Sequence, residues 1–187
     1  MFVDILLLVV GAVSSFITMA LLARFFMQWK RVSFRTPVGH FVIAVTNWAV
    51  MPLRRFVPGL FGLDMASLLP AWIVQMLQFS IEAPLGGLPM RVLPGTPLFG
   101  LFGLALMAVY LLFGIVFIAA VFSWLGSHVP AARIFGELAR PFLAPFQRRI
   151  PPLGGMDLSP LVLLLVLQII LKILERARIG ALAFLAS

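Results

Sequence analysis

The chain has 187 residues, of which 63% are hydrophobic and 11% charged, and its formal net charge is +8. Its mean hydropathy of +1.14 excludes an ordinary water-soluble domain, which at this size has too little interior to bury so much apolar surface. The absence of cysteine excludes disulfides, thiolate metal sites and cysteine nucleophiles. Because the arginines flank apolar runs, the positive charge is expected to face anionic phospholipids, and no direct binding of nucleic acid is expected.

Four apolar runs are predicted to be membrane-spanning helices, since a span needs ~20 mostly apolar residues. They cover approximately residues 3–22, 65–81, 98–125 and 158–174. We expect the first run to be retained and not cleaved as a secretory signal, because no basic residue precedes it and it carries Asp4. The predicted fold class is therefore an all-α membrane protein with four transmembrane helices.

An internal repeat relates the two halves of the chain. A shift of 93 residues aligns them without a gap over the central window, and the matched pairs are Pro37 with Pro130, Pro52 with Pro145, Arg55 with Arg148, Pro58 with Pro151, Gly62 with Gly155, and Asp64 with Asp157. Such matches indicate a duplication. Each copy holds two spans, an even number, so both copies are expected to share one orientation. The predicted organisation is a first repeat over 1–83, an extracytoplasmic loop over 84–97, and a second repeat with a C-terminal tail over 98–187.

A short segment separates the two spans of each copy. In the second copy, "AARIFGELARPFL" places Arg133, Glu137 and Arg140 on one helical face, with Arg133 and Glu137 spaced to pair. The opposite face carries Ile134, Phe135, Leu138 and Phe142. The first-copy segment "VGHFVIAVTNWAV" has His40 and Asn47 at the matching positions. At about 13 residues each segment is too short to span a bilayer, so an interfacial or re-entrant helix is expected.

The stretch "PFQRRIPPLGGMDLSP" begins at Pro145, which is expected to end or kink the preceding helix. Gly154 and Gly155 favour a tight turn. Arg148 and Arg149 are expected at the level of the lipid headgroups, where arginine can hold phosphate. The candidate lipid-binding or partner-binding residues of the two copies are Arg54, Arg55, Arg133, Arg140, Arg148 and Arg149.

A carboxylate precedes the second span of each copy. Asp64 and Asp157 stand where a helix N-cap belongs, and Arg148 is expected to pair with Asp157. A competing hypothesis places both carboxylates in an ion or proton pathway. Gln75 and Gln168 coincide under the same shift and are expected to face the interface between the repeats, either as helix–helix contacts or as pore-lining groups.

Aromatic residues mark the expected helix ends. Trp29 and Trp124 follow apolar runs and are interpreted as interfacial anchors, while Trp48 and Trp72 are interpreted as packing residues. Tyr110 falls in the middle of a span, where an interhelical hydrogen bond is expected.

The repeated unit resembles the YggT family of bacterial and plastid membrane proteins, also called YlmG. The stretch "LARPFLAPFQRRIPPLGGMDLSP" carries most of the resemblance, together with "RFFMQW" and "AAVFSW" at the helix ends. The first copy departs from this pattern at Phe61, where the second has a glycine, and at Met65, Ala66 and Ser67. The resemblance implies no catalytic activity. It implies roles connected with membrane-protein assembly, division or nucleoid organisation, or osmotic tolerance.

Standard catalytic arrangements are absent from the sequence. Two histidines are too few for a recognisable metal motif, and there is no phosphate-binding loop or nucleophile elbow. We therefore expect a non-enzymatic scaffold or assembly factor of the bacterial inner membrane that needs no cofactor. Its expected partners are anionic phospholipids, other membrane proteins and further copies of the chain. The alternatives are a small oligomeric channel or transporter subunit and, with least support, an enzyme acting on lipid.

The distribution of basic residues predicts the orientation in the membrane. Ten of the 14 Lys and Arg residues lie between the first two or the last two spans. Cytoplasmic loops carry such an excess, so both repeat linkers are predicted to be cytoplasmic, with the N-terminus outside. The tail "LKILERARIGALAFLAS" also carries basic residues and is expected to lie along the outer surface as an amphipathic helix.

Overall fold

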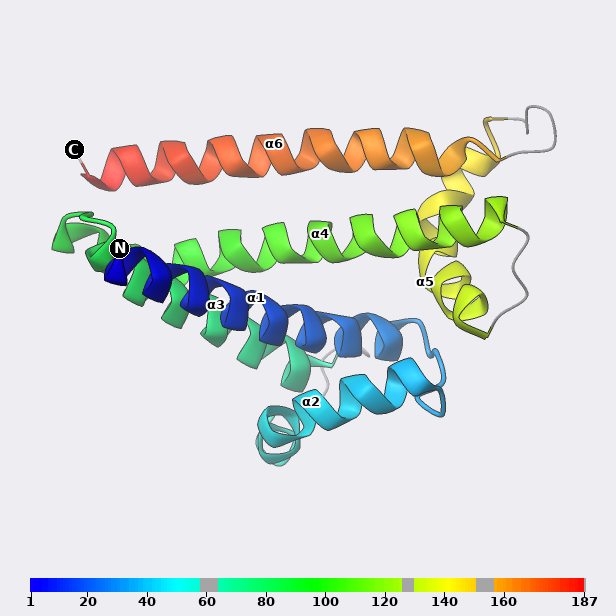
Figure 1. The fold of residues 1–187 in the computed structure, drawn as a ribbon, viewed down its shortest axis with the longest axis horizontal. Helices are drawn as coiled ribbons and strands as arrows, with labels where there is room; N and C mark the ends of the chain where they lie inside the picture. Colours follow the sequence, from blue (N-terminus) through cyan, green and yellow to red (C-terminus); the bar gives the residue numbers. More distant parts are fainter. Residues whose placement is uncertain (58–63, 126–129, 151–156, 187) are drawn as a thin grey trace.

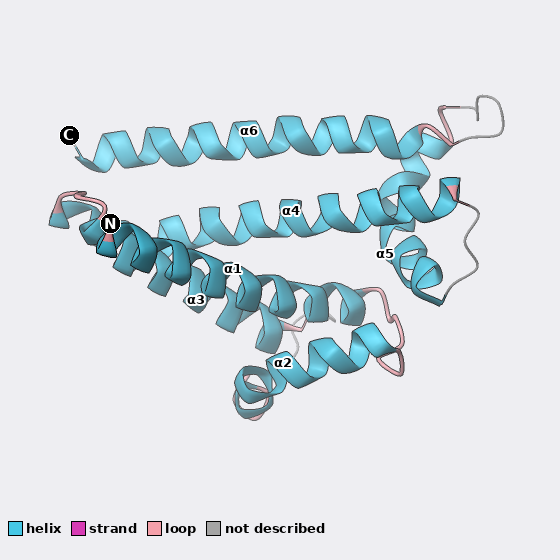
Figure 2. Ribbon diagram, in the orientation of Figure 1, coloured by secondary structure: helices cyan, strands magenta, loops and turns pink. Residues whose placement is uncertain are grey.

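The computed structural model describes residues 1–57, 64–125, 130–150 and 157–186. Over these ranges the chain is helical and contains no strand, which confirms the all-α prediction (Figure 2). The helices are α1 (Phe2–Trp29), α2 (Pro37–Leu53), α3 (Met65–Leu85), the short 3-10 helix η1 (Met90–Gly95), α4 (Thr96–Trp124), α5 (Pro130–Gln147) and α6 (Ser159–Ala186). The turn expected at Gly154 and Gly155 lies outside the described residues.

Two helical stretches in the described ranges are long and apolar enough to cross a membrane. They are α1 and the segment Met90–Trp124, which consists of η1 followed directly by α4. The helices α1 and α4 end at Trp29 and Trp124, as expected. The separate helix expected for the C-terminal tail is wrong, because α6 continues without a break to Ala186. Its last turns pack on η1 and the start of α4, where Leu182 and Leu185 pack against the cluster that contains Phe99.

The helix order of the first half, long then short then long, recurs in the second half. Figure 1 shows that α1 and α4 run in the same direction, while α3 and α6 return beside them. Both short helices, α2 and α5, therefore lie at one end of the molecule. Both termini lie at the other end.

Helix packing links the two halves. Within each half the two long helices contact one another, α1 with α3 and α4 with α6, and α3 also packs along α4. A second link lies at the end that carries the short helices. There Phe142 of α5 contacts Phe26 and Trp29 of α1, with ring centroids 6.3 and 6.1 Å apart. Lys30 Nζ lies 3.5 Å from the centroid of the Trp29 ring, a cation–π contact at the same place.

The short helices begin and end for local reasons. Thr36 caps α2, because its Oγ1 accepts a hydrogen bond from Gly39 N at 3.1 Å, and Pro37 occupies the first helical position. Pro145 was expected to end or kink its helix, and α5 ends two residues after it, at Gln147. Because Pro145 lies in the last turn, few helical residues follow it, and the turn still closes with Arg148 N donating to Ala144 O at 3.2 Å.

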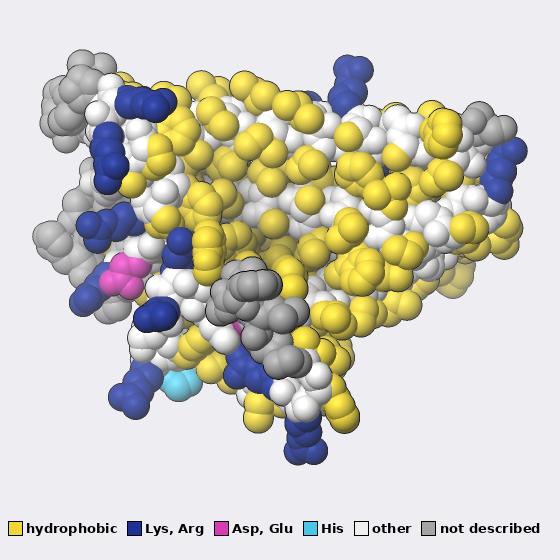
Figure 3. All heavy atoms as spheres, turned by 180° about the vertical axis from the view of Figure 1, so that it is seen from behind, with side chains coloured by type: hydrophobic (Ala, Val, Ile, Leu, Met, Phe, Trp, Pro, Cys, Tyr) yellow, Lys and Arg dark blue, Asp and Glu magenta, His cyan; other side chains and the backbone are white. Residues whose placement is uncertain are grey.

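The surface separates into two regions. Figure 3 shows hydrophobic side chains over the long helices, while most Lys and Arg side chains on that face gather at the end formed by α2 and α5. Many apolar side chains of the long helices are exposed, among them Phe2, Leu8, Phe117 and Ile169. Trp48, which the sequence suggested as a packing residue, is 64% exposed, so that interpretation is wrong.

Candidate functional site at the arginine-rich end

The helix α5 is amphipathic in the predicted sense. Arg133 Nε lies 3.0 Å from Glu137 Oε1, and Arg140 is exposed on the same side. The opposite side is buried and carries Ile134, Leu138, Ala139 and Leu143. An exposed ion pair of this kind contributes little stability, about 0.3–0.5 kcal/mol. The buried side therefore holds the helix in place, and the arginines remain free to contact other molecules.

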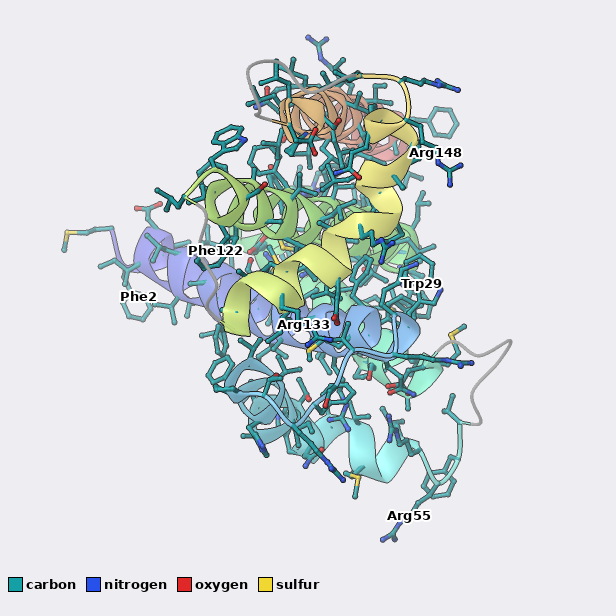
Figure 4. The ribbon with its side chains drawn as sticks, turned by 90° about the vertical axis from the view of Figure 1, so that its right-hand side faces the viewer. Phe2, Trp29, Arg55, Phe122, Arg133 and Arg148 are labelled. Atoms are coloured by element: carbon teal, nitrogen blue, oxygen red, sulfur yellow. The ribbon has the colours of Figure 1, made fainter. Side chains whose placement is uncertain are left out.

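Basic side chains from both short helices and their flanks are spread across this end. Figure 4 looks onto it and shows α5 crossing in front of the ends of α4 and α1, with Arg133 and Arg148 on its outer side and Arg55 near the end of α2. Arg55, Arg140, Arg148 and Arg149 are all exposed. In contrast to the sequence expectation, no ion pair joins Arg148 to Asp157 in the described part of the chain.

Asp64 is buried at the start of α3 and forms a three-residue cluster. Its Oδ2 accepts hydrogen bonds from Arg54 Nη2 at 3.1 Å and from Ser67 Oγ at 2.6 Å. Arg54 also donates to Gln28 Oε1 at 2.6 Å, which joins the cluster to α1. Asp64 occupies the N-cap position, but its side chain accepts no backbone N–H, so the expected capping bond is wrong. The carboxylate is turned toward the guanidinium and the hydroxyl instead, and the Arg54 side chain remains 41% exposed.

Asp157 has a different set of partners. Its Oδ1 accepts the backbone N–H of Ser159 at 2.9 Å, which agrees with the predicted role at a helix start. Its Oδ2 accepts a hydrogen bond from Gln147 Nε2 at 2.7 Å. Gln147 follows Arg54 by 93 residues, so one repeat position supplies both partners, charged in the first copy and neutral in the second. Burial raises the pKa of Asp157, but hydrogen bonds from Ser159 and Gln147 outweigh it, and the pKa is lowered.

Arg24 is a candidate that sequence reasoning placed wrongly. The first span was predicted to end near residue 22, which left Arg24 just after it, but α1 continues past Arg24 and its side chain is 5% exposed. Its Nη1 donates to Thr46 Oγ1 at 2.8 Å and to Asn47 Oδ1 at 2.9 Å, both on α2. The adjacent polar residues Thr46 and Asn47, in an otherwise apolar segment, were the feature of the sequence that could have indicated a buried polar partner. The repeat gave none, because the position equivalent to Arg24 is Phe117. His40 is exposed.

The two repeated glutamines have different environments. Gln75 is buried, and its Nε2 donates to Thr18 Oγ1 at 3.0 Å and to Gln78 Oε1 at 3.1 Å. Gln78 in turn donates to Glu82 Oε1 at 2.8 Å, so a line of polar side chains runs along α3. Gln75 also meets Gly103 of α4, where an added Cβ would lie 2.2 Å from Gln75 Oε1, so it lies at the contact between the two halves, as predicted. Gln168 is exposed on α6, and the prediction for it is wrong.

A small polar cavity adjoins Gln75. It has a volume of about 180 Å³ and lies between α3, α4 and α6, lined in part by Glu82, Tyr110, Glu175 and Arg178. Tyr110 OH donates to Glu175 Oε1 at 3.3 Å, the interhelical hydrogen bond that the sequence predicted. In the ranges that the structure describes, no group of three or more His, Asp or Glu side chains is arranged to hold a metal ion.

The fold and this site define a class of all-helical protein with a duplicated helix unit, an apolar outer surface and one arginine-rich end. The family model described as CCB3/YggT matches residues 3–85 and 98–177, one match for each unit. The chain therefore belongs to the CCB3/YggT family. No solved structure matches it significantly.

Similar proteins come from several bacteria, and their descriptions state no activity. The protein YggT of Escherichia coli is 33% identical over 157 residues, which cover 82% of this chain and 80% of that protein. An uncharacterised protein of Pseudomonas aeruginosa is 30% identical over 169 residues, covering 87% and 84%. A protein of Vibrio alginolyticus is 34% identical over 152 residues, covering 80% and 82%.

Proposed function

We propose that the chain is a non-enzymatic scaffold or assembly factor of the bacterial inner membrane, crossing it four times, with its arginine-rich end on anionic phospholipid headgroups. Its two units would be related by an axis along the membrane normal. The observation that carries the proposal is α5, whose apolar side is buried on the long helices while Arg133 and Arg140 point outward. Basic side chains that face outward at the end of apolar helices are typical of the level of the lipid headgroups.

The orientation follows from the same end of the molecule. Excess Lys and Arg favour the cytoplasmic side, so α2 and α5 are proposed to be cytoplasmic and both termini outside. A chain without cysteine allows a clean labelling test. Ser33→Cys lies at the arginine-rich end and Met90→Cys at the other, and both positions are exposed. In intact cells an impermeant maleimide should label only Met90→Cys. Labelling of Ser33→Cys alone would show that the orientation is the reverse of the one proposed, and labelling of both variants would contradict the topology.

Lipid binding is tested separately. The protein is purified in mild detergent and transferred to mixed phosphatidylethanolamine and phosphatidylglycerol, and native mass spectrometry then reports which lipids it retains. Replacing Arg133, Arg140, Arg148 and Arg149 by Gln should abolish the preference for phosphatidylglycerol, because each basic residue near a surface contributes about 1 kcal/mol. The matched control replaces the four basic residues away from this end, Arg91, Lys172, Arg176 and Arg178, by Gln. An unchanged preference in the fourfold variant would contradict the lipid-binding role.

A channel or transporter subunit is the alternative. The polar cavity beside Gln75 and the line of side chains from Thr18 to Glu82 favour it, because polar groups inside a membrane mark ion pathways. Against it, Gln75 and Gln78 are hydrogen-bonded to their neighbours, as in helix–helix contacts. Ion flux in proteoliposomes that disappears in Gln75→Leu, while the protein still folds, would favour the channel.

A further inference from the structure

The polar cavity beside Gln75 lies between helices of both units. The helices α3 and α6 both pack on α4, and the cavity lies in the space that remains between them. Its walls carry two carboxylates, Glu82 and Glu175, and one guanidinium, Arg178. Its volume of about 180 Å³ leaves room for a charged group of several atoms.

The charges around the cavity are only partly neutralised by one another. Glu175 Oε2 lies 3.1 Å from Lys172 Nζ, so this carboxylate already has a cation beside it. Glu82 accepts a hydrogen bond from the neutral side chain of Gln78. Neither Glu82 nor Arg178 takes part in an ion pair within the described ranges. The cavity therefore presents one negative group on α3 and one positive group on α6 to a ligand.

These two groups lie at a similar level along their helices. Both α3 and α6 start at the arginine-rich end and run toward the end that carries the termini (Figure 1). At a rise of 1.5 Å per residue, Glu82 lies about 26 Å from the start of α3 and Arg178 about 29 Å from the start of α6. A bilayer core is about 30 Å thick, so in the proposed topology both groups lie near the headgroups of the outer leaflet.

The cavity is closed toward the termini. On that side an apolar cluster joins α3, η1, the start of α4 and the last turns of α6, and it contains Ala83, Val92, Phe99, Leu182 and Leu185. This cluster separates the cavity from the aqueous phase beyond the ends of the helices. A ligand is therefore expected to enter from the side, between α3 and α6.

An apolar groove adjoins the cavity at its side. The groove has a volume of about 760 Å³, runs along α6, and shares Tyr110 and Glu175 with the cavity. From Glu175 it extends past Ile169 to Leu165, a distance of about 15 Å along the helix, which is half the thickness of a bilayer core. A charged cavity joined to an apolar groove of this length matches an amphiphile with a charged head and one acyl chain directed toward the middle of the bilayer.

We propose that the cavity binds the headgroup of a phosphatidylethanolamine molecule of the outer leaflet, with an acyl chain in the groove along α6. The primary ammonium group of the lipid donates to Glu82, and its phosphate accepts from Arg178, so both contacts are charge-assisted hydrogen bonds. Phosphatidylglycerol has no ammonium group, and the ammonium group of phosphatidylcholine has no N–H, so neither lipid can donate in this way to Glu82. The inference rests on the proposed membrane topology and adds a lipid site in the leaflet opposite the arginine-rich end.

Lipid retention tests the site. The protein is transferred in mild detergent to equal amounts of phosphatidylethanolamine, phosphatidylglycerol and phosphatidylcholine, and native mass spectrometry reports how much of each is retained. Glu82→Gln and Arg178→Gln should each lower the retention of phosphatidylethanolamine about tenfold, because each removes a hydrogen bond to a charged group. The matched controls are Arg35→Gln and Glu137→Gln, which remove exposed charges at the other end and should leave this retention unchanged. Unchanged retention in either cavity variant, or equal retention of phosphatidylethanolamine and phosphatidylcholine by the wild type, would overturn the proposal.

A second measurement locates the lipid and identifies its source. Met107 lines the cavity, and Met107→Cys places the single thiol of the chain there. In nanodiscs that contain phosphatidylethanolamine, N-ethylmaleimide should react with this thiol several-fold more slowly than in nanodiscs of phosphatidylglycerol alone, and the difference should vanish when Glu82→Gln is added. Equal rates in the two lipids would overturn the proposal. Equal protection by dissolved phosphoethanolamine in phosphatidylglycerol nanodiscs would show that the cavity takes a free zwitterion, and would overturn the assignment to a lipid.

Failure of this site is distinguishable from failure of the proposed function. The single variants Glu82→Gln and Arg178→Gln should keep the preference for phosphatidylglycerol that is assigned to the arginine-rich end. The fourfold arginine variant should keep its phosphatidylethanolamine. A wrong topology is detected by the labelling of Ser33→Cys and Met90→Cys, which does not depend on either lipid.

Discussion

Gly103 is the point at which α4 approaches α3 most closely, and replacing it by alanine tests how the two halves are held together. A Cβ at this position would lie 2.2 Å from Gln75 Oε1 and 3.1 Å from Gln75 Cδ. Gln75 cannot move aside without loss, because its amide nitrogen donates to Thr18 and Gln78. Gly114 is the matched control in the same helix, since a Cβ there would meet nothing within 4 Å.

The expected change in the free energy of unfolding combines one stabilising effect with two destabilising effects. Replacing glycine by alanine inside a helix stabilises it by about 1 kcal/mol. Overpacking costs about 1–3 kcal/mol, and a lost hydrogen bond of Gln75 costs a further 0.5–1.5 kcal/mol or so. Gly103→Ala should therefore destabilise the protein by about 0.5–3.5 kcal/mol, whereas Gly114→Ala should stabilise it by up to about 1 kcal/mol.

The assay is unfolding in mixed micelles by increasing sodium dodecyl sulfate, followed by the fluorescence of the four tryptophans. A second background makes the result specific. In Gln75→Ala the clashing oxygen is gone, so Gly103→Ala should become neutral or stabilising there. If Gly103→Ala proves as stable as Gly114→Ala, or if its effect is the same in the Gln75→Ala background, the close packing of α3 and α4 is refuted.

Three further predictions use the same unfolding assay. Asp64→Ala should destabilise by about 2 kcal/mol, and by more than Asp157→Ala, because it removes the buried acceptor of hydrogen bonds from Arg54 and from the fully buried Ser67; equal losses would count against this. Asp157→Asn should be tolerated better than Asp157→Ala, since Asn can still accept the N–H of Ser159. Because the pKa of Asp157 is lowered in the folded state, the stability that its carboxylate contributes is present above the unfolded pKa of about 4 and is lost as the pH falls through the folded value. The Asp157→Asn variant should therefore lose less stability in acid than the wild type. An identical loss in both proteins would contradict the sign of the pKa shift. Asn47→Leu should lower the free energy of unfolding more than Arg24→Leu does, because it leaves the buried Arg24 charge without one of its acceptors. The double variant with both substitutions should be more stable than Asn47→Leu alone. Failure of this rescue would show that Arg24 does not depend on Asn47.

Periodicity and the repeat predicted the parts of the fold that depend on local sequence. The helical order follows from alternating apolar runs and proline-rich links. The charged face of α5 follows from residues spaced three and four apart, and the pairing of Arg133 with Glu137 is a direct consequence of that spacing. The interhelical hydrogen bond of Tyr110 was also predictable, because a hydroxyl among apolar side chains needs a hydrogen-bond partner.

The parts that could not be predicted depend on neighbours distant in the chain. Gln75 and Gln168 occupy the same place in their units, but α3 lies between two long helices and α6 lies at the edge of the molecule. The repeat predicts equal environments for the two glutamines, and it cannot show which of the two helices lies at the edge of the molecule. The partner of Asp157 was missed for a related reason, since both Gln147 and Arg148 lie within reach in the sequence and only the turn of α5 decides between them.

The buried position of Arg24 has a consequence for biogenesis. While α1 is leaving the ribosome, its guanidinium has no hydrogen-bond partner within α1 among the bonds described, since both acceptors lie on α2, 22 and 23 residues later in the chain. At a synthesis rate of about 5–20 residues per second, this delay lasts roughly one to five seconds. Closure of α1 on α2 is therefore the step that supplies the partners of this guanidinium, and it does not require α3. The second unit has Phe117 at the equivalent place, so α4 carries no such group that depends on α5 for its partners.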